Sequence, residues 1–200
     1  MVVRDVQSAK LIPLAEALYR GGIRFLEVTY SANGRISDKE TANQIESLSH
    51  HFKSRMHIGA GTVLTENQVL LTKAAGGRFI ISPDTDIAVI QKTKAFGMIS
   101  IPGALTPSEI KQAHRAGADF VKLFPISRLG ADYVKAIRAP LPHIRLLAVG
   151  GINLQNMSEY RNAGVCGFGI GTSITDKKLL ETEDYEGITK LAERYVAATV

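Results

Sequence analysis

The feature that most constrains the fold of this chain is a repeated unit, in which a short apolar run is followed by a helical stretch. The helical stretches carry apolar residues at helical spacing, and several end at glycine. Strands that alternate with helices in this way indicate parallel βα units. The expected strands cover residues 1–4, 25–30, 57–62, 79–82, 98–101, the run holding Lys122, 145–149 and 167–170.

The expected helices cover residues 7–20, 38–51, 65–76, 86–96, 106–117, 131–137, 155–163 and 185–197. Eight such units predict a single (β/α)8 barrel domain over residues 1–200. Because such barrels usually need about 250 residues, this one is expected to be compact, with short loops. A doubly wound open sheet is the alternative, and it is disfavoured because no G-x-G-x-x-G pattern follows the first strand.

Composition narrows the classes of function. The formal net charge is +5, and the charges are scattered without a basic stripe, which argues against a nucleic-acid partner and favours small anionic substrates. Cys166 is the single cysteine, so an internal disulfide is excluded and an intracellular, cytoplasmic location is expected. We find no signal peptide and no apolar run long enough to span a membrane, so no membrane partner is expected.

One lysine lies inside the apolar run Phe120-Val121-Lys122-Leu123-Phe124-Pro125. Because side chains alternate along a strand, Lys122 shares a face with Phe120 and Phe124. Loss of hydration disfavours the charged form of a lysine, and a neutral amine can attack a ketone to form a Schiff base. The alternative is a structural lysine that is satisfied by a buried carboxylate.

Glu27 is a carboxylate that could face this lysine across a small barrel. In a (β/α)8 barrel the active site lies at the carboxyl ends of the strands. If Leu26 and Val28 pack under helices, Glu27 and Thr29 point into the barrel. A carboxylate that faces Lys122 is either an inert ion-pair partner or a general acid/base beside a reactive amine.

Other strand ends contain glycine, proline and threonine. Thr62 ends the strand Gly59-Ala60-Gly61-Thr62, where small residues either leave room for a ligand or permit tight strand–helix packing. Val149-Gly150-Gly151 and Gly171-Thr172-Ser173 follow the seventh and eighth strands, where barrels often bind phosphate through backbone N–H groups. The alternative is a pair of tight turns. No histidine shares a strand end with a carboxylate pair, so no metal site is expected.

Together these motifs resemble the 2-keto-3-deoxy-6-phosphogluconate (KDPG) and 4-hydroxy-2-oxoglutarate (KHG) aldolase family, which includes the phosphogalactonate aldolases. The matching segments are Leu26-Glu27-Val28-Thr29, Gly59-Ala60-Gly61-Thr62-Val63-Leu64, Ile81-Ser82-Pro83, Pro102-Gly103, Val121-Lys122-Leu123-Phe124-Pro125, Gly150-Gly151-Ile152 and Gly167-Phe168-Gly169-Ile170-Gly171. They occur in the family's order over nearly the whole chain.

The resemblance implies a homotrimeric class I aldolase that acts without a cofactor in carbohydrate metabolism of the Entner–Doudoroff type. Its substrates would be phosphorylated 2-keto acids, cleaved to pyruvate and glyceraldehyde 3-phosphate. Lys122 would form the Schiff base and Glu27 would be the general acid/base. The implied substrate-binding residues are Thr62, Pro83, Phe124 and Val149, and the implied phosphate-binding residues are Gly150, Gly151, Gly171 and Thr172.

The sequence departs from the family pattern at two places. The family usually carries arginine, or asparagine in galactonate-type members, four positions after the glutamate to meet the substrate carboxylate; here that position is Ser31, a further candidate substrate-binding residue. The family also usually has a helix and the start of strand one before Val2, which this chain is expected to lack. In addition, Val149 stands where gluconate-type members usually have threonine and galactonate-type members have valine.

Two other functions are compatible with these residues. A non-catalytic phosphosugar-binding barrel is permitted by the fold, although the presence of Glu27 and Lys122 counts against it. A phosphosugar isomerase or epimerase would need a second acid/base or a metal set, and the sequence offers no evident candidate for either.

Overall fold

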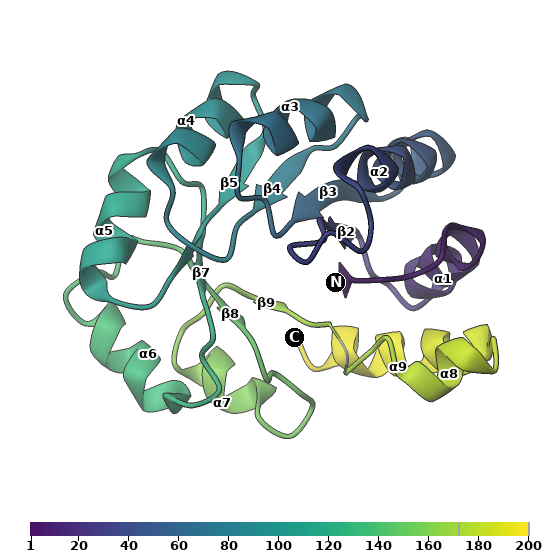
Figure 1. Cartoon of the computed structure of the whole chain (residues 1–200). Helices are drawn as coiled ribbons and strands as arrows, with labels where there is room; N and C mark the ends of the chain where they lie inside the picture. The colour runs from purple at the N-terminus through teal and green to yellow at the C-terminus, as the bar shows by residue number, and fades with distance from the viewer. Residues whose placement is uncertain (172, 200) are drawn as a thin grey trace.

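The computed structural model describes residues 1–171 and 173–199, and its strands stand inside a ring of helices (Figure 1). The strands are β1 (Val2–Val3), β2 (Phe25–Thr29), β3 (His57–Gly61), β4 (Phe79–Ile81), β5 (Ile99–Ile101), β6 (Gly103–Ala104), β7 (Val121–Leu123), β8 (Leu146–Val149) and β9 (Gly167–Gly169). The helices are α1 (Ser8–Arg20), α2 (Asp38–Phe52), α3 (Glu66–Ala74), α4 (Ile87–Ala95), α5 (Pro107–Arg115), α6 (Gly130–Arg138), α7 (Met157–Asn162), α8 (Lys177–Glu181) and α9 (Tyr185–Ala197).

The strands close into a barrel. Parallel pairing runs through β1-β2-β3-β4-β5 and through β6-β7-β8-β9. Pro102 lies between β5 and β6 and has no backbone N–H, so these two short strands are the halves of one interrupted strand. The Lys122 N–H donates to the Pro102 carbonyl over 2.9 Å, and the Val2 N–H donates to the Ile170 carbonyl over 2.8 Å. These bonds join the two sheets at both edges, which confirms the (β/α)8 barrel and excludes an open sheet.

Strand alternation sorts the side chains as the sequence predicts. Leu26 and Val28 are buried in the core beneath the helices, and so are Val121 and Leu123. Their neighbours on the opposite face therefore point into the barrel, which is how Glu27 and Lys122 reach its interior.

The helix ends are fixed by side-chain caps and by close packing. The Thr106 hydroxyl and the Glu109 carboxylate form a capping box at the start of α5, and Thr65 caps α3. The first and last helices of the ring are neighbours, because the Thr189 hydroxyl on α9 donates to the Ala17 carbonyl of α1 over 3.0 Å. Figure 1 shows α9 beside α1, with both chain termini on the same side of the barrel.

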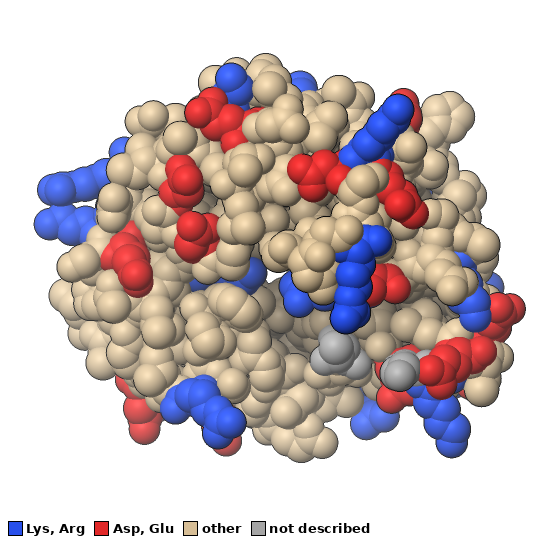
Figure 2. Space-filling model, in the orientation of Figure 1, with Lys and Arg blue, Asp and Glu red and all other residues tan. Residues whose placement is uncertain are grey.

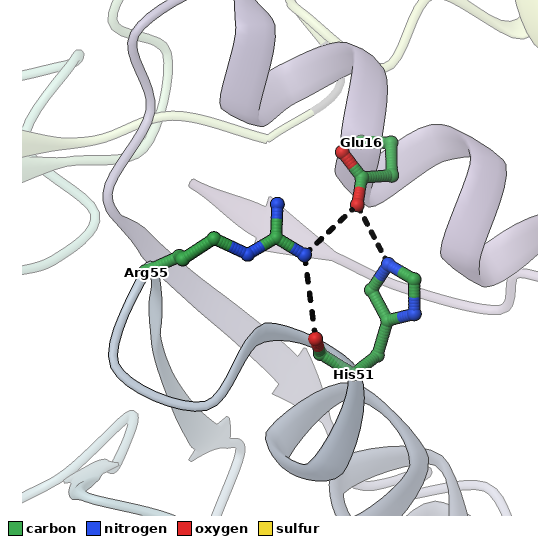
Figure 3. A network of polar contacts seen from close by, with 3 residues as sticks. All are labelled: Glu16, His51 and Arg55. Atoms are coloured by element: carbon green, nitrogen blue, oxygen red, sulfur yellow. Dashed lines mark hydrogen bonds and ion pairs between the residues drawn. The ribbon is translucent and has the colours of Figure 1, made fainter.

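A polar cluster on the outside of the barrel ties α1 to α2 (Figure 3). One carboxylate oxygen of Glu16 lies 2.6 Å from Nε2 of His51 and 3.2 Å from the guanidinium of Arg55. The same guanidinium donates to the His51 carbonyl. Because His51 and Arg55 both bind the carboxylate, the pKa of Glu16 is lowered.

The charged surface is mixed, as the sequence indicated. Figure 2 shows Lys and Arg interspersed with Asp and Glu over one face, without a continuous region of one sign. Within the described residues, no helix has the length and hydropathy needed to cross a bilayer.

Several element boundaries differ from the sequence expectations. The fifth strand resumes after Pro102 as β6, whereas we expected it to stop at Ile101. Helix α2 begins at Asp38, as expected, and runs one residue further, to Phe52; the Ser37 hydroxyl caps it by accepting from the Glu40 N–H. The short helix α8, capped by Asp176, was not expected.

Candidate active site

Lys122 lines two separate spaces. The mouth pocket has a volume of about 530 Å³ and lies at the carboxyl ends of the strands. The inner cavity has a volume of about 350 Å³ and extends from the level of Lys122 toward the amino ends of the strands. Glu27, Lys122 and Val149 line both spaces. Most of the predicted site residues line the mouth pocket: Glu27, Thr62, Pro83, Lys122, Phe124, Val149, Gly150, Gly151 and Gly171.

Lys122 has the environment of a reactive amine. The residue is 8% exposed, and Nζ lies 4.4 Å from the centroid of the Phe124 ring. Burial lowers the pKa of Lys122; the charge of Glu27 opposes this shift, and the charge of Arg4 adds to it. The neutral amine is the nucleophilic form, so the barrel interior favours the state that attacks carbonyl carbon.

Glu27 is equally buried, and a glycine makes room for it. The residue is 5% exposed, and a β-carbon placed on Gly61 of the neighbouring strand would overlap its carboxylate. Burial raises the pKa of Glu27, while the positive charges of Lys122 and Arg4 oppose that shift. A carboxyl group with a raised pKa is suited to exchanging protons near neutral pH.

The charges of Glu27 and Lys122 interact electrostatically, but the two side chains form no close ion pair. Each shifts the pKa of the other. Among the described residues, however, no nitrogen–oxygen contact of 4.0 Å or less joins them. A purely structural pair would be expected to sit in direct contact, because burial of two charges is offset only by good contact geometry. The geometry therefore favours the acid/base interpretation over the inert pair.

The loop after β8 has two positions that favour glycine. Gly150 and Gly151 both have positive φ values, of 93° and 76°. A β-carbon on Gly150 would press on the Phe124 ring, and one on Gly151 would overlap the side chain of Ser127. Glycine thus lets this backbone line the mouth pocket closely, as a loop that approaches an anion must.

Arg4 is a pocket residue that the sequence analysis did not single out. It lines the mouth pocket, and its guanidinium lies 3.5 Å from the hydroxyl oxygen of Thr62. A rule already applied to the other strands would have found it, because Arg4 is a charged residue just beyond β1 and alternates with Val2. It places a positive charge in the mouth pocket, close enough to shift the pKa of both Glu27 and Lys122.

Two predicted site residues are not among the described lining residues, whereas Thr29 lies on the face that was expected for it. Ser31 is not among the described residues that line the mouth pocket, and its hydroxyl donates to Oδ1 of Asn33 over 2.7 Å. Thr172 lies outside the described residues. Thr29 is buried on the same face as Glu27, and its hydroxyl has no hydrogen-bond partner in the described structure.

The glycines of β3 make room for neighbouring side chains. The sequence left two explanations for Gly59 and Gly61, room for a ligand or tight strand–helix packing. A β-carbon on Gly59 would overlap the Phe79 ring, just as one on Gly61 would overlap the Glu27 carboxylate. The space is therefore filled by side chains of the protein itself. In the described part of the chain, no group of three or more His, Cys, Asp or Glu side chains could hold a metal ion.

Comparison with known proteins agrees with this geometry. Residues 1–191 match the sequence profile of the family described as KDPG and KHG aldolase. A probable 2-dehydro-3-deoxy-6-phosphogalactonate aldolase from Rhizobium meliloti is 44% identical over 174 residues, covering 86% of this chain and 79% of that protein. A 2-dehydro-3-deoxy-phosphogluconate aldolase from Treponema pallidum is 32% identical over 187 residues, covering 92% and 84%.

Solved structures with the same fold include relatives of both types. A native KDPGal structure superposes with a TM-score of 0.88 at 28% identity, covering 98% of this chain and 91% of that one. KDPG aldolase from Legionella pneumophila, with pyruvate captured as a covalent carbinolamine intermediate, superposes with a TM-score of 0.85 at 32% identity, covering 96% and 90%. With a profile match over 191 residues and a buried lysine–glutamate site, this chain belongs to the KDPG and KHG aldolase family.

Proposed function

We propose that this chain is a class I aldolase that cleaves 2-keto-3-deoxy-6-phospho sugar acids to pyruvate and glyceraldehyde 3-phosphate. The observation that carries the proposal is the buried Lys122 amine, whose pKa is lowered at the floor of a pocket that also holds Glu27. Relatives named as phosphogluconate and as phosphogalactonate aldolases support this substrate class. The KHG part of the family description makes 4-hydroxy-2-oxoglutarate a further candidate substrate.

The reaction follows from the two buried groups. The neutral Lys122 amine adds to C2 of the substrate, and the carbonyl oxygen leaves as water to give an iminium. Glu27, acting through a water, takes the proton of the C4 hydroxyl. The C3–C4 bond breaks, its electron pair passes into the iminium, and the aldehyde departs. Glu27 returns a proton to C3 of the enamine, and hydrolysis releases pyruvate.

Arg4 and the Gly150–Gly151 loop supply the charges and donors that an anionic substrate needs. Arg4 lines the mouth pocket, whereas Ser31, which holds the position of the family arginine, is not in its described lining. We therefore assign recognition of the substrate carboxylate to Arg4, with Thr62 beside it. The phosphate is assigned to the backbone N–H groups of the glycine loop, because glycine permits their close approach.

The two alternative functions explain fewer features of the site than an aldolase does. A non-catalytic binding barrel gives no reason to bury a lysine and a glutamate without direct pairing. An isomerase or epimerase that used two acid/base groups would have to draw on Lys122 as the second one. It would then leave no covalent adduct with pyruvate, so that measurement separates the two reactions.

A homotrimer, a cytoplasmic location and a role in sugar-acid breakdown of the Entner–Doudoroff type complete the proposal. Exposed Leu64, Leu70 and Ile87, before α3, on α3 and on the adjacent α4, support an interface between copies. Light scattering should give three times the mass of one chain, and a monomer at micromolar concentration would contradict the trimer.

The catalytic proposal is tested by Lys122→Met, which keeps the length of the side chain and removes the amine. Pyruvate release from both phosphorylated epimers should fall to background, whereas Lys111→Met, at an exposed position on α5, should retain turnover. Turnover of the unmodified protein should also survive EDTA. Near-normal turnover by Lys122→Met would overturn the proposal.

A further inference from the structure

One side-chain amide holds the loop to which the substrate phosphate is assigned. Nδ2 of Asn156 donates to the Gly151 carbonyl over 2.9 Å, and Oδ1 of the same side chain accepts from the Asn153 N–H over 2.9 Å. The amide therefore binds the backbone on both sides of Ile152. Asn156 itself is not among the described residues that line the mouth pocket, whereas Gly151 and Ile152 are.

The segment that carries Asn156 is a compact turn before α7. Oδ1 of Asn153 accepts from the Gln155 N–H over 2.9 Å and from the Asn156 N–H over 3.2 Å. After β9, the Ser173 hydroxyl donates to the Ile152 carbonyl over 3.2 Å. The loop is thus held from the α7 side by Asn156 and from the β9 side by Ser173.

The bond to Gly151 fixes the direction of the next N–H. The C=O and N–H of one trans peptide point in opposite directions. Because the Gly151 carbonyl points toward Asn156, outside the described lining of the mouth pocket, the Ile152 N–H points toward the pocket. Within the described part of the chain, the N–H groups of residues 150–152 make no hydrogen bond. These N–H groups are therefore open to an anion.

We propose that Asn156 is a positioning residue for the substrate phosphate. Its amide holds the Gly151–Ile152 peptide so that the Ile152 N–H faces the phosphate, and it thereby sets the preference for phosphorylated substrates. The inference rests on the proposed function, which assigns the phosphate to this loop.

The conformational freedom of glycine is the reason that this peptide needs to be held. Gly151 has a φ of 76° and no β-carbon, so without the amide the peptide can rotate. Rotation would turn the Gly151 carbonyl toward the mouth pocket and replace a donor with an oxygen that repels the anion. A sugar acid without phosphate does not use this N–H, so its cleavage should not depend on Asn156.

The test compares cleavage of 2-keto-3-deoxy-6-phosphogluconate with cleavage of 2-keto-3-deoxygluconate, which lacks the phosphate. Asn156→Ala should lower the ratio of the two kcat/KM values by at least about tenfold, because a hydrogen bond to a charged group contributes roughly 10- to 100-fold. The loss should appear as a higher KM for the phosphorylated acid, since its phosphate is bound alike in the ground state and the transition state. Exchange of the pyruvate methyl protons in D₂O involves no phosphate and should stay near the unmodified rate.

Asn153→Ala is the matched control, because its side chain caps the same turn and does not bond to Gly151. Both variants should lose thermal stability, but the control should keep the ratio of the unmodified protein. Both acids are measured on one preparation, so the ratio does not depend on the folded fraction. Asn156→Ser, whose side chain is too short to make both bonds, takes the place of Asn156→Ala should that variant not fold.

An unchanged ratio in the folded Asn156 variant, or an equal fall in Asn153→Ala, would overturn the inference. If the unmodified protein exchanges the pyruvate protons but does not prefer the phosphorylated acid, the inference is wrong and the aldolase reaction stands. If it neither exchanges these protons nor cleaves either acid, both the inference and the proposed function fail.

Discussion

The carboxylate of Glu27 occupies the place where Gly61 would carry a β-carbon if it were any other residue. Gly61 is the Cα partner of Thr29, two residues after Glu27, so the glutamate side chain leans toward the carboxyl ends of the strands. This contact holds the carboxylate inside the barrel, where the charges of Glu27 and Lys122 interact. Gly61 on β3 thereby sets the position of Glu27, the proposed acid/base group on β2.

Gly61→Ala should therefore lower turnover by about 10²–10⁴, the usual contribution of a positioned acid/base group, because the methyl group displaces the carboxylate. Gly59→Ala is the matched control on the same strand, since its methyl group would overlap the Phe79 ring and not the Glu27 carboxylate. That control should lose thermal stability but keep its turnover per folded molecule. Equal kcat values for the two variants would show that Gly61 does not position Glu27.

The pH dependence of adduct formation should report the environment of Lys122. Burial lowers its pKa, so the rate of adduct formation with pyruvate should rise through a midpoint below the ordinary lysine value of about 10.4. The charge of Glu27 opposes this shift by favouring the ammonium form. Glu27→Gln should therefore move the midpoint to still lower pH, even though turnover falls. Borohydride trapping at a series of pH values measures both midpoints, and a rise in the variant would refute this electrostatic account.

We expect Val149 to determine how strongly the site discriminates between the two substrate configurations at C4. Its side chain lines the mouth pocket, and its methyl groups stand against Gly169 of the neighbouring strand. Valine offers no hydrogen bond to a substrate hydroxyl, whereas the threonine usual in gluconate-type members does. We expect comparable kcat/KM values for the phosphogalactonate and phosphogluconate epimers, and a shift toward phosphogluconate in Val149→Thr. A strong preference for phosphogluconate that the substitution leaves unchanged would show that Val149 does not determine the preference between the two epimers.

Glu16 should make stability depend on pH in the acid range. Its pKa is lowered in the folded protein by His51 and Arg55, so its contribution is present above the unfolded pKa and is lost as pH falls through the folded value. Glu16→Gln should reduce the free energy of unfolding at pH 7 by about 1 kcal/mol or less, because the three side chains are about one third exposed or more. Below about pH 4 the difference should shrink toward zero.

Urea unfolding of both proteins at several pH values measures this difference. Glu186→Gln is the control, because its pairing with Lys190 on α9 is 70% exposed on both sides and should contribute little. A difference between Glu16→Gln and the unmodified protein that grows as the pH falls would contradict the prediction.

Much of the barrel could be predicted from the sequence because local rules fix it. Alternation in β2 and β7 was enough to place Glu27 and Lys122 inside and Leu26 and Leu123 outside. Side-chain caps such as Thr65 mark helix starts through bonds to residues nearby in the chain. These features depend on neighbours within a few positions, so a single sequence contains them.

What could not be predicted depends on residues far apart in the chain. Resumption of the fifth strand after Pro102 needs pairing with β7, which begins at Val121. The reason for glycine at position 61 appears only when the Glu27 side chain is placed beside it. The strand-end rule could have placed Arg4 at the mouth of the barrel, but its contact with Thr62, far away in the chain, appears only in the folded structure.

The central claim is that Lys122 is the covalent nucleophile. Borohydride reduction in the presence of pyruvate, followed by proteolysis and peptide mass mapping, tests it most directly. The account predicts one stable pyruvate adduct on the peptide that contains Lys122, and no adduct in folded Lys122→Met. Absence of the adduct in the unmodified protein at saturating pyruvate, or an adduct on another lysine that persists in Lys122→Met, would contradict it.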